Sequence, residues 1–293
     1  MEFVKSLFQC KKPWPCPQPV NVERRHFDQL KHNEYVVSHK ADGERVIVVV
    51  KDGRVRGFRR NGDVFDIRVR FGSSVYGGTV LDCELVGGDI WVFDIFALSG
   101  VNYIEHNLHV RRNAAADAIS TIIPMARDSH EFQIKPVWDA RECVSVYRDC
   151  EGACDGLIFT PVNHPVRIGT DEMLLKWKPL RELTVDFKYT RMLRSSSPIR
   201  AIKTGIGYDV EREDVYALSV KFRDSIMPVA YVPCDDDGIY DSLIVESRFV
   251  DGRWFPVRIR ADKVDANSNF VYQRTLKNIQ EKIEVSELEL NFF

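Results

Sequence analysis

Long hydrophobic runs are missing from this 293-residue chain, so no membrane-spanning helix of about 20 apolar residues is expected. The N-terminus also lacks a signal-peptide pattern, which predicts a soluble intracellular protein. An excess of one charge is missing as well, because 41 Lys and Arg nearly balance 43 Asp and Glu. No global field therefore indicates nucleic acid binding, and a charged ligand would need a local patch.

A regular cysteine framework is also absent. The seven cysteines show no repeated spacing, and an odd number is typical of free thiols in a reducing compartment. Neither Cys10 with Cys16 nor Cys150 with Cys154 belongs to paired Cys-x-x-Cys motifs, so a structural zinc site is not expected. The chain is long enough for one large or two modest domains.

The first part of the chain has the pattern of a mixed α/β domain. Residues 1–19 are irregular and rich in proline, which predicts an extended lead-in. Asp-Gly at 52–53 and Asn-Gly at 61–62 predict tight hairpin turns. Strands are predicted over 45–50, 54–59, 63–67, 79–86, 89–96, 132–137, 156–161 and 173–177. Helices are predicted over 22–30, 108–123 and 140–150, with Arg111 and Arg112 on a solvated face of the second.

The sequence pattern changes after residue 185. Ser195 to Pro198 predict a loop. Short strands are predicted over 216–222, 228–232, 242–250 and 253–260. Strands of this length and spacing favour a small barrel or sandwich. Apolar residues at helical spacing from Tyr272 to Ile283, preceded by Asn267, Ser268 and Asn269, predict a capped helix. The predicted domains are 1–185, 186–266 and a helical tail, 267–293.

Lys40 stands in a polar break between two β-prone runs, in Ser38-His39-Lys40-Ala41-Asp42-Gly43-Glu44-Arg45. A lysine against an apolar strand is unusual because an ammonium group is costly to desolvate. Two interpretations follow: a solvated hairpin residue, or a nucleophilic amine at the floor of a nucleotide pocket.

Four more polar clusters lie on or beside predicted strands, where alternate side chains share one face. They are Asp82 with Glu84, Asp155, Lys176 with Lys178, and the run from Arg258 through Arg260 and Asp262 to Lys263. Each cluster alone is compatible with the solvent-exposed face of a strand. Together they supply a nucleophile, carboxylates for a hard divalent cation, and cationic groups for phosphates.

In this order, Lys-x-Asp-Gly-x-Arg, Asp-x-Glu, Asp-Gly-aliphatic and Lys-x-Lys resemble the motifs of the covalent nucleotidyltransferases. These comprise polynucleotide ligases and mRNA capping guanylyltransferases. Lys-Ala-Asp-Gly at Lys40, Leu-Leu-Lys-Trp-Lys-Pro around Lys176 and Arg-x-Asp-Lys ending at Lys263 resemble the capping branch, in a compact form similar to its viral members. The resemblance runs from about residue 19 to 285. Ser247 and Ala266 depart from the family's usual Cys and Pro, away from the proposed reacting groups.

The resemblance implies an α+β fold: an ATP-grasp-like nucleotidyltransferase domain of antiparallel sheets with flanking helices, then a small oligonucleotide-binding (OB-fold) β-barrel and a C-terminal helix. It implies transfer of GMP from GTP, through a covalent lysyl–GMP intermediate, to the 5′-diphosphate end of RNA. Mg²⁺ or Mn²⁺ would be the cofactor. Further implied partners are an RNA triphosphatase, a cap methyltransferase or RNA polymerase. The location would be the nucleus for a cellular protein and the host nucleus or cytoplasm for a viral one.

Two alternatives stay open at this point. An ATP-dependent DNA or RNA ligase would use the same lysine chemistry with adenylate. An inactive relative would bind RNA or a polymerase tail through the barrel, although a pure binder has no need of Lys40 together with the carboxylates and the two other lysines.

The resemblance also implies a role for each matched residue. Lys40 would carry the GMP, while Lys176 and Lys178 would favour its neutral form by like-charge repulsion and would neutralise the α-phosphate. Glu84 and Asp155 would bind the metal, with Asp82 as a third candidate ligand. The implied nucleotide contacts are Asp42, Arg45 and Arg60, Phe93 stacked on the base opposite Ile158, and Arg258, Arg260, Asp262 and Lys263 at the leaving pyrophosphate. The barrel would close on GTP and reopen for RNA.

Overall fold

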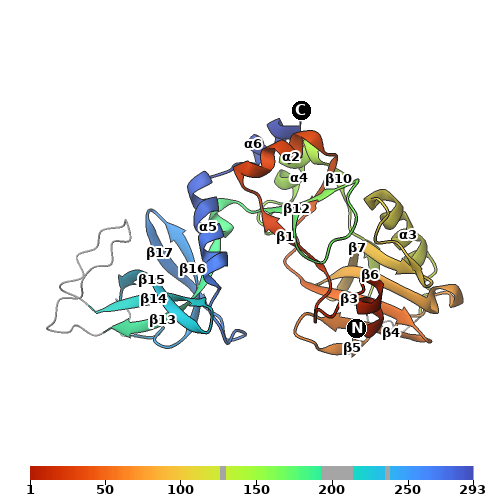
Figure 1. The fold of residues 1–293 in the computed structure, drawn as a ribbon, viewed down its shortest axis with the longest axis horizontal. Helices are drawn as coiled ribbons and strands as arrows, with labels where there is room; N and C mark the ends of the chain where they lie inside the picture. Colours follow the sequence, from red (N-terminus) through yellow and green to blue (C-terminus); the bar gives the residue numbers. More distant parts are fainter. Residues whose placement is uncertain (126–129, 193–213, 235–237, 293) are drawn as a thin grey trace. The chain divides into compact units, whose positions relative to one another are not determined.

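The computed structural model describes residues 1–125, 130–192, 214–234 and 238–292 (Figure 1). It divides into two compact units, one formed by residues 1–178 with 283–293 and one by residues 179–282. No helix in the described part of the chain has both the length and the apolar character needed to cross a bilayer. The overall α+β class predicted from the sequence is confirmed.

The first unit contains a seven-stranded sheet. Its strands are β3 (Glu44–Lys51), β4 (Arg54–Arg59), β5 (Val64–Asp66), β6 (Gly77–Val86), β7 (Asp89–Leu98), β8 (Val101–Asn102) and β9 (Phe132–Ile134). The order is β5-β4-β3-β6-β7-β8, with β9 parallel to β7. Asp52 and Gly53 both have positive φ, as a tight hairpin turn requires, so the predicted turn between β3 and β4 is confirmed.

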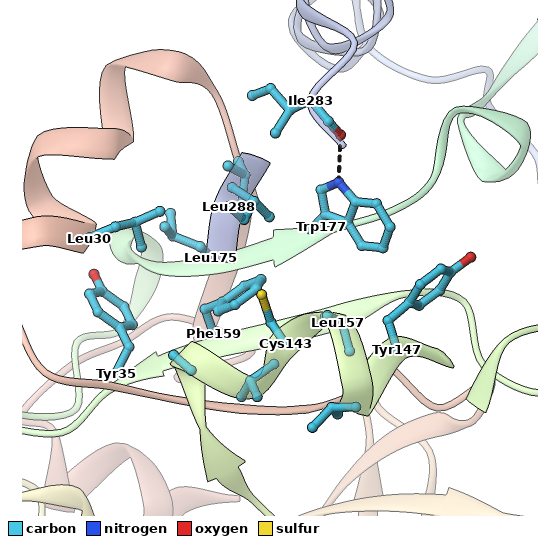
Figure 2. Packing of buried hydrophobic residues seen from close by; sticks show 14 of the residues in the cluster. Leu30, Tyr35, Cys143, Tyr147, Leu157, Phe159, Leu175, Trp177, Ile283 and Leu288 are labelled. Carbon is cyan, nitrogen blue, oxygen red and sulfur yellow. Dashed lines mark hydrogen bonds between the residues drawn. The ribbon is translucent and has the colours of Figure 1, made fainter. Parts of the chain in front are cut away.

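The second sheet of this unit has five strands, in the order β1-β12-β11-β2-β10. They are β1 (Pro17–Asn21), β2 (Tyr35–His39), β10 (Trp138–Asp139), β11 (Leu157–Pro161) and β12 (Gly169–Trp177). Helices α2 (Phe27–His32), α4 (Cys143–Cys150) and α6 (Val285–Glu289) contribute to its core. In this core the Trp177 indole donates a 2.8 Å hydrogen bond to the carbonyl oxygen of Ile283, which fixes the end of the chain to β12 (Figure 2).

Helix α3 (Leu108–Ser120) packs its alanine face on the seven-stranded sheet, where Ala114, Ala115 and Ala118 are buried. Asn107 caps its N-terminus by accepting a hydrogen bond from the main chain of Val110. The remaining short helices of this unit are α1 (Glu2–Leu7), η1 (Arg24–His26), η2 (Ser73–Tyr76), η3 (Ala140–Glu142) and η5 (Leu290–Phe292).

The predicted extended lead-in over residues 1–19 is wrong for much of its length. Residues 2–7 form helix α1, and Pro17–Asn21 form strand β1, paired in parallel with β12. Val4, Trp14 and Cys16 are buried beside Phe96 in one hydrophobic cluster. The proline count pointed to an open chain, but the apolar residues between the prolines bury enough surface to hold the segment against the sheet.

The second unit is a five-stranded antiparallel sheet in the order β15-β14-β13-β16-β17. Its strands are β13 (Thr184–Met192), β14 (Val215–Phe222), β15 (Ser225–Pro233), β16 (Ile244–Val250) and β17 (Arg253–Ile259), and η4 (Leu180–Glu182) precedes them. Five strands are the number an OB-fold has. Within the described residues they form an open path from β15 to β17, and the predicted loop at 195–198 lies outside those residues.

Helix α5 (Asn269–Glu281) belongs to this second unit, where Tyr272 packs edge-on against Phe187 at 5.8 Å between ring centroids. Ser268 caps its N-terminus, as predicted. The helix ends earlier than its apolar spacing suggested: Lys282 adopts φ of 47°, and Ile283 packs into the core of the first unit. The observed units therefore differ from the predicted domain limits, because residues 179–185 and α5 join the small unit and the last residues return to the large one.

The expectation of free thiols is wrong for one pair of cysteines. Cys150 and Cys154 form a disulfide with a Cα–Cα distance of 5.6 Å. Their separation of four residues allows this because α4 ends at Cys150 and the chain turns back through a Gly152 with positive φ. The other five cysteines are free.

Candidate active site

Lys40 lies at the end of β2 and is held there by its main chain. Its N–H donates to the carbonyl of Gly156 at 2.8 Å, and its own carbonyl accepts from the N–H of Asp155 at 2.9 Å. Gly156 has φ of 140°, and a Cβ at this position would lie 2.1 Å from the carbonyl oxygen of Trp177. The glycine is therefore required by both conformation and space, and it lets the segment before β11 pass close to Lys40 and β12.

Three predicted site residues meet at the Lys40 amine. Its Nζ donates to Asp155 Oδ2 at 2.7 Å, and Lys178 Nζ donates to the same oxygen at 3.0 Å. Burial disfavours the charged form of Asp155, but the hydrogen bonds and positive charges of the two lysines outweigh it and lower the pKa of this carboxyl group. Asp155 is thus an anion shared by two ammonium groups, and the two lysines lie close together as predicted.

A cavity of about 500 Å³ opens beside Lys40 between the two sheets of the first unit. The predicted residues that line it are Lys40, Arg45, Arg60, Asp82, Glu84, Phe93, Ile158 and Lys176. Asp155 and Lys178 do not line it: Asp155 contacts Lys40, and Lys178 contacts Asp155. Asp42 is exposed and lies outside the lining, because the turn after Lys40 carries it into solvent.

Arg45 and Asp82 form a pair that leaves little of the carboxylate open. Arg45 Nε donates to Asp82 Oδ1 at 2.8 Å, its Nη2 contacts Oδ2, and Asp82 is fully buried. The guanidinium also lies 5.4 Å from the Phe93 ring centroid, a cation–π distance. Asp82 therefore orients Arg45 beneath the Phe93 ring, which makes it a weaker candidate for a metal ligand than Glu84.

A divalent cation would bind here with only part of its coordination shell supplied by protein side chains. Within the described ranges, no three His, Cys, Asp or Glu side chains converge on one point. Mg²⁺ commonly uses one or two carboxylates and completes its shell with water and substrate phosphates. Glu84, which lines the cavity, and Asp155, which touches Lys40, are the carboxylates that suit this kind of binding.

Several residues that line the cavity were not predicted from the sequence. Arg111 and Arg112 were predicted to be solvated, and this is wrong: Arg111 is 3% exposed and pairs with Asp94 at 2.8 and 3.0 Å. Lys135 is 4% exposed, and its Nζ lies 3.7 Å from Glu84 and 5.7 Å from the Phe93 centroid. His164, whose Nε2 lies 3.1 Å from Asp171, also faces the cavity.

Burial is the main reason that the pKa of Lys135 is lowered, with Lys40 and Arg112 adding to the effect and Glu84 opposing it. The sequence carried one usable signal for these residues: Lys135 is a lone cation just after a short apolar strand, as Lys40 is. The double arginine at 111–112 carried none, because charged pairs near a helix start are usually solvated.

The second unit holds the predicted pyrophosphate cluster in a compact network. Arg260 bonds to Asp186 at 3.1 Å and to Asp262 at 2.7 Å, while Lys263 also contacts Asp186. Arg258 donates to Glu246 at 2.6 Å. The hydrogen bond from Arg260 lowers the pKa of Asp262 to about 2. Asp186 and Glu246, which were not predicted, hold these cations in place within the unit.

Two models of known protein families match consecutive parts of the chain. The family model for the mRNA capping enzyme catalytic domain matches residues 1–180, and the model for the mRNA capping enzyme C-terminal domain matches residues 182–289. The chain belongs to the mRNA capping enzyme family. The family's catalytic domain ends within two residues of Lys178 and therefore covers Lys40, Glu84, Asp155 and the cavity.

Individual relatives agree with this assignment. The "mRNA-capping enzyme" of Danio rerio is 27% identical over 310 residues, which cover 95% of this chain and 49% of the relative. The "mRNA-capping enzyme" of Caenorhabditis elegans is 27% identical over 215 residues, 63% of this chain and 34% of the relative. The "mRNA-capping enzyme subunit alpha" of Schizosaccharomyces pombe is 27% identical over 337 residues, 98% and 81% of the two chains.

The chain thus spans about a third and about half of the two animal relatives. A solved structure described as "mycobacterial DNA ligase D complexed with ATP and MES" is 14% identical, covers 87% of this chain and all of that one, and has a TM-score of 0.47. This likeness is too distant to add to a functional conclusion.

Proposed function

We propose that this chain is an mRNA guanylyltransferase that uses Lys40 as its nucleophile. The observation that carries the proposal is the position of the Lys40 amine, which lines a nucleotide-sized cavity and shares one carboxylate oxygen with Lys178. This arrangement lies in the part of the chain that the family's catalytic domain matches.

The proposed reaction has two steps. In the first, the neutral amine of Lys40 attacks the α-phosphorus of GTP, an N–P bond forms, the bond to the β-phosphate oxygen breaks to release pyrophosphate, and the nitrogen gives one proton to solvent. In the second, a terminal oxygen of a 5′-diphosphate RNA attacks the same phosphorus. The N–P bond then breaks, and the amine of Lys40 is restored with a proton from solvent.

The chain's own residues would supply most of the electrostatic stabilisation. Lys176 lines the cavity and Lys178 touches the oxygen that holds Lys40, so both place positive charge where the α-phosphate develops negative charge. Lys40 must give up a proton before it can attack. A bound Mg²⁺ or Mn²⁺ on Glu84 and Asp155 would add charge neutralisation at the phosphates.

A preference for guanine over adenine is supported by Lys135. It is a buried amine beside the proposed stacking ring Phe93, and an ammonium group can only donate hydrogen bonds. Guanine presents a carbonyl oxygen at C6, whereas adenine presents an amino group there. The buried cation would therefore favour GTP and disfavour ATP.

The first experiment incubates the protein with α-labelled GTP or ATP and a divalent cation, denatures it, and asks which label stays bound. The proposal predicts label from GTP that survives alkali and is lost in acid, as a phosphoramidate should be. Label from ATP alone would instead support a polynucleotide ligase. The absence of label from both, in folded protein, would support a relative without catalytic activity.

A further inference from the structure

Arg112 occupies an unusual place on the wall of the cavity. It lies at the start of α3, is partly buried, and lines the cavity beside Phe93 and Lys135. Its Nη2 donates to the carbonyl oxygen of Lys135 at 2.6 Å, and its Nη1 donates to the carbonyl oxygen of Phe93 at 3.3 Å. One guanidinium thus joins the main chains of two residues whose side chains form the same wall.

The bridge lies where the strand pairing ends. Strands β7 and β9 run parallel up to the pair Val92–Ile134, and the N–H of Lys135 still donates to the carbonyl of Val92 at 2.8 Å. Beyond that point the ladder ends, and the carbonyl oxygens of Phe93 and Lys135 both accept hydrogen bonds from the Arg112 guanidinium. Arg112 thus links strands β7 and β9 one residue beyond their last pair.

The neighbouring arginine anchors this bridge. Arg111 is fixed by the buried carboxylate of Asp94 and by the carbonyl oxygens of His106 and His164, at 2.6 and 3.1 Å. Consecutive residues on a helix point about 100° apart, so Arg111 fastens α3 while Arg112 reaches the end of the strand pair. Burial lowers the pKa of Arg112 and Asp94 opposes this, which fits a guanidinium kept inside for its donor geometry.

We propose that Arg112 is a positioning residue that sets the spacing between the Phe93 ring and the Lys135 amine, and thereby the recognition of the base. The inference rests on the proposed function. It assigns no contact with the reacting phosphate, so loss of Arg112 should weaken nucleotide binding and base selectivity while the rate at saturating GTP changes little.

The test compares Arg112→Met, which keeps an unbranched stem but has no donors, and Arg112→Lys, which keeps the charge but not the planar fork of donors. Arg141→Met is the matched control, since Arg141 is an exposed arginine of the same unit that pairs with Asp139. Expected is a rise of about tenfold in the KM for GTP in both Arg112 variants, with the preference for GTP over ATP reduced by a similar factor. The kcat for adduct formation should stay within about threefold of wild type, and Arg141→Met should leave both parameters unchanged.

A double-mutant cycle with Phe93→Leu separates positioning from general loss of stability. If Arg112 acts through the Phe93 wall, the two effects on KM will be clearly less than additive. Additive effects, an unchanged KM, or a fall in kcat that tracks a lower Tm would overturn the inference. Titration of GTP into Lys40→Ala protein, with and without the Arg112 substitution, measures the same change in binding when no adduct can form. A wild-type protein that forms no adduct would therefore contradict the proposed function but not the role of Arg112.

Discussion

Replacing Asp155 with Asn tests the arrangement around Lys40 most sharply. The substitution keeps an oxygen that can accept hydrogen bonds but removes the negative charge between Lys40 and Lys178. Hydrogen bonds to charged groups contribute about 1.5–3 kcal/mol when buried, whereas exposed ion pairs contribute about 0–1 kcal/mol. The three side chains are 25%, 24% and 27% exposed, so solvent screens the pair and we expect a loss of only about 1 kcal/mol in the free energy of unfolding.

The effect on adduct formation should be larger. Asp155 is one of two carboxylates suited to the metal and the residue that orients the amine, so its loss should lower the adduct rate by about 100-fold, equivalent to about 2.7 kcal/mol in activation free energy. Single-turnover labelling with GTP and urea unfolding give the two quantities. Asp139→Asn is the control, because Asp139 is also an aspartate paired with a cation, Arg141, whereas Asp155 is the aspartate that contacts Lys40. An adduct rate within threefold of wild type would refute the role of Asp155.

The pH dependence of stability gives a second readout of the same residue. The pKa of Asp155 is lowered in the folded state from an ordinary value of 3.8, so this group binds fewer protons in the folded state than in the unfolded state. Its stabilising contribution is present above about pH 3.8 and is lost as the pH falls through the lower folded value. The stability difference between wild type and Asp155→Asn should therefore be constant near neutral pH and shrink in acid; a difference that grows in acid would contradict the assignment.

Three further variants test separate parts of the account. Gly156→Ala should lower the free energy of unfolding by about 2 kcal/mol or more, measured in urea, because its Cβ would meet Trp177; Gly53→Ala, which also has a positive φ but open space around its Cβ position, should cost about 1 kcal/mol. Lys135→Met should reduce the preference for GTP over ATP in adduct labelling by about tenfold, and an unchanged ratio would exclude it from base reading. Trp177→Phe should cost about 1 kcal/mol in urea through loss of the bond to Ile283, and no loss would show that this bond does not hold the C-terminus.

The sequence was informative where the signal lies within a short stretch of the chain. Lys40 and Asp155 stood out because a charged residue at the end of an apolar strand needs a partner, and the structure shows that they are each other's partner. The hairpin turns followed from Asp-Gly and Asn-Gly pairs for an equally local reason.

What the sequence could not show depends on long-range packing. Nothing near Arg112 indicates that it bridges strands β7 and β9, and nothing near residue 283 indicates that the chain leaves α5 and returns to the first unit. The helix at residues 2–7 was hidden in the same way, because its stability comes from burial against Phe96 and not from its own pattern.

The most direct test of the central claim is to locate the nucleotide on the protein. After incubation with GTP and Mg²⁺, the protein would be digested under alkaline conditions and its peptides analysed by tandem mass spectrometry. The account predicts a GMP adduct on Lys40, absent from Lys40→Ala and from Lys40→Arg while both variants keep the wild-type fold. A GMP adduct on another lysine, or an adduct that persists in Lys40→Ala, would contradict it.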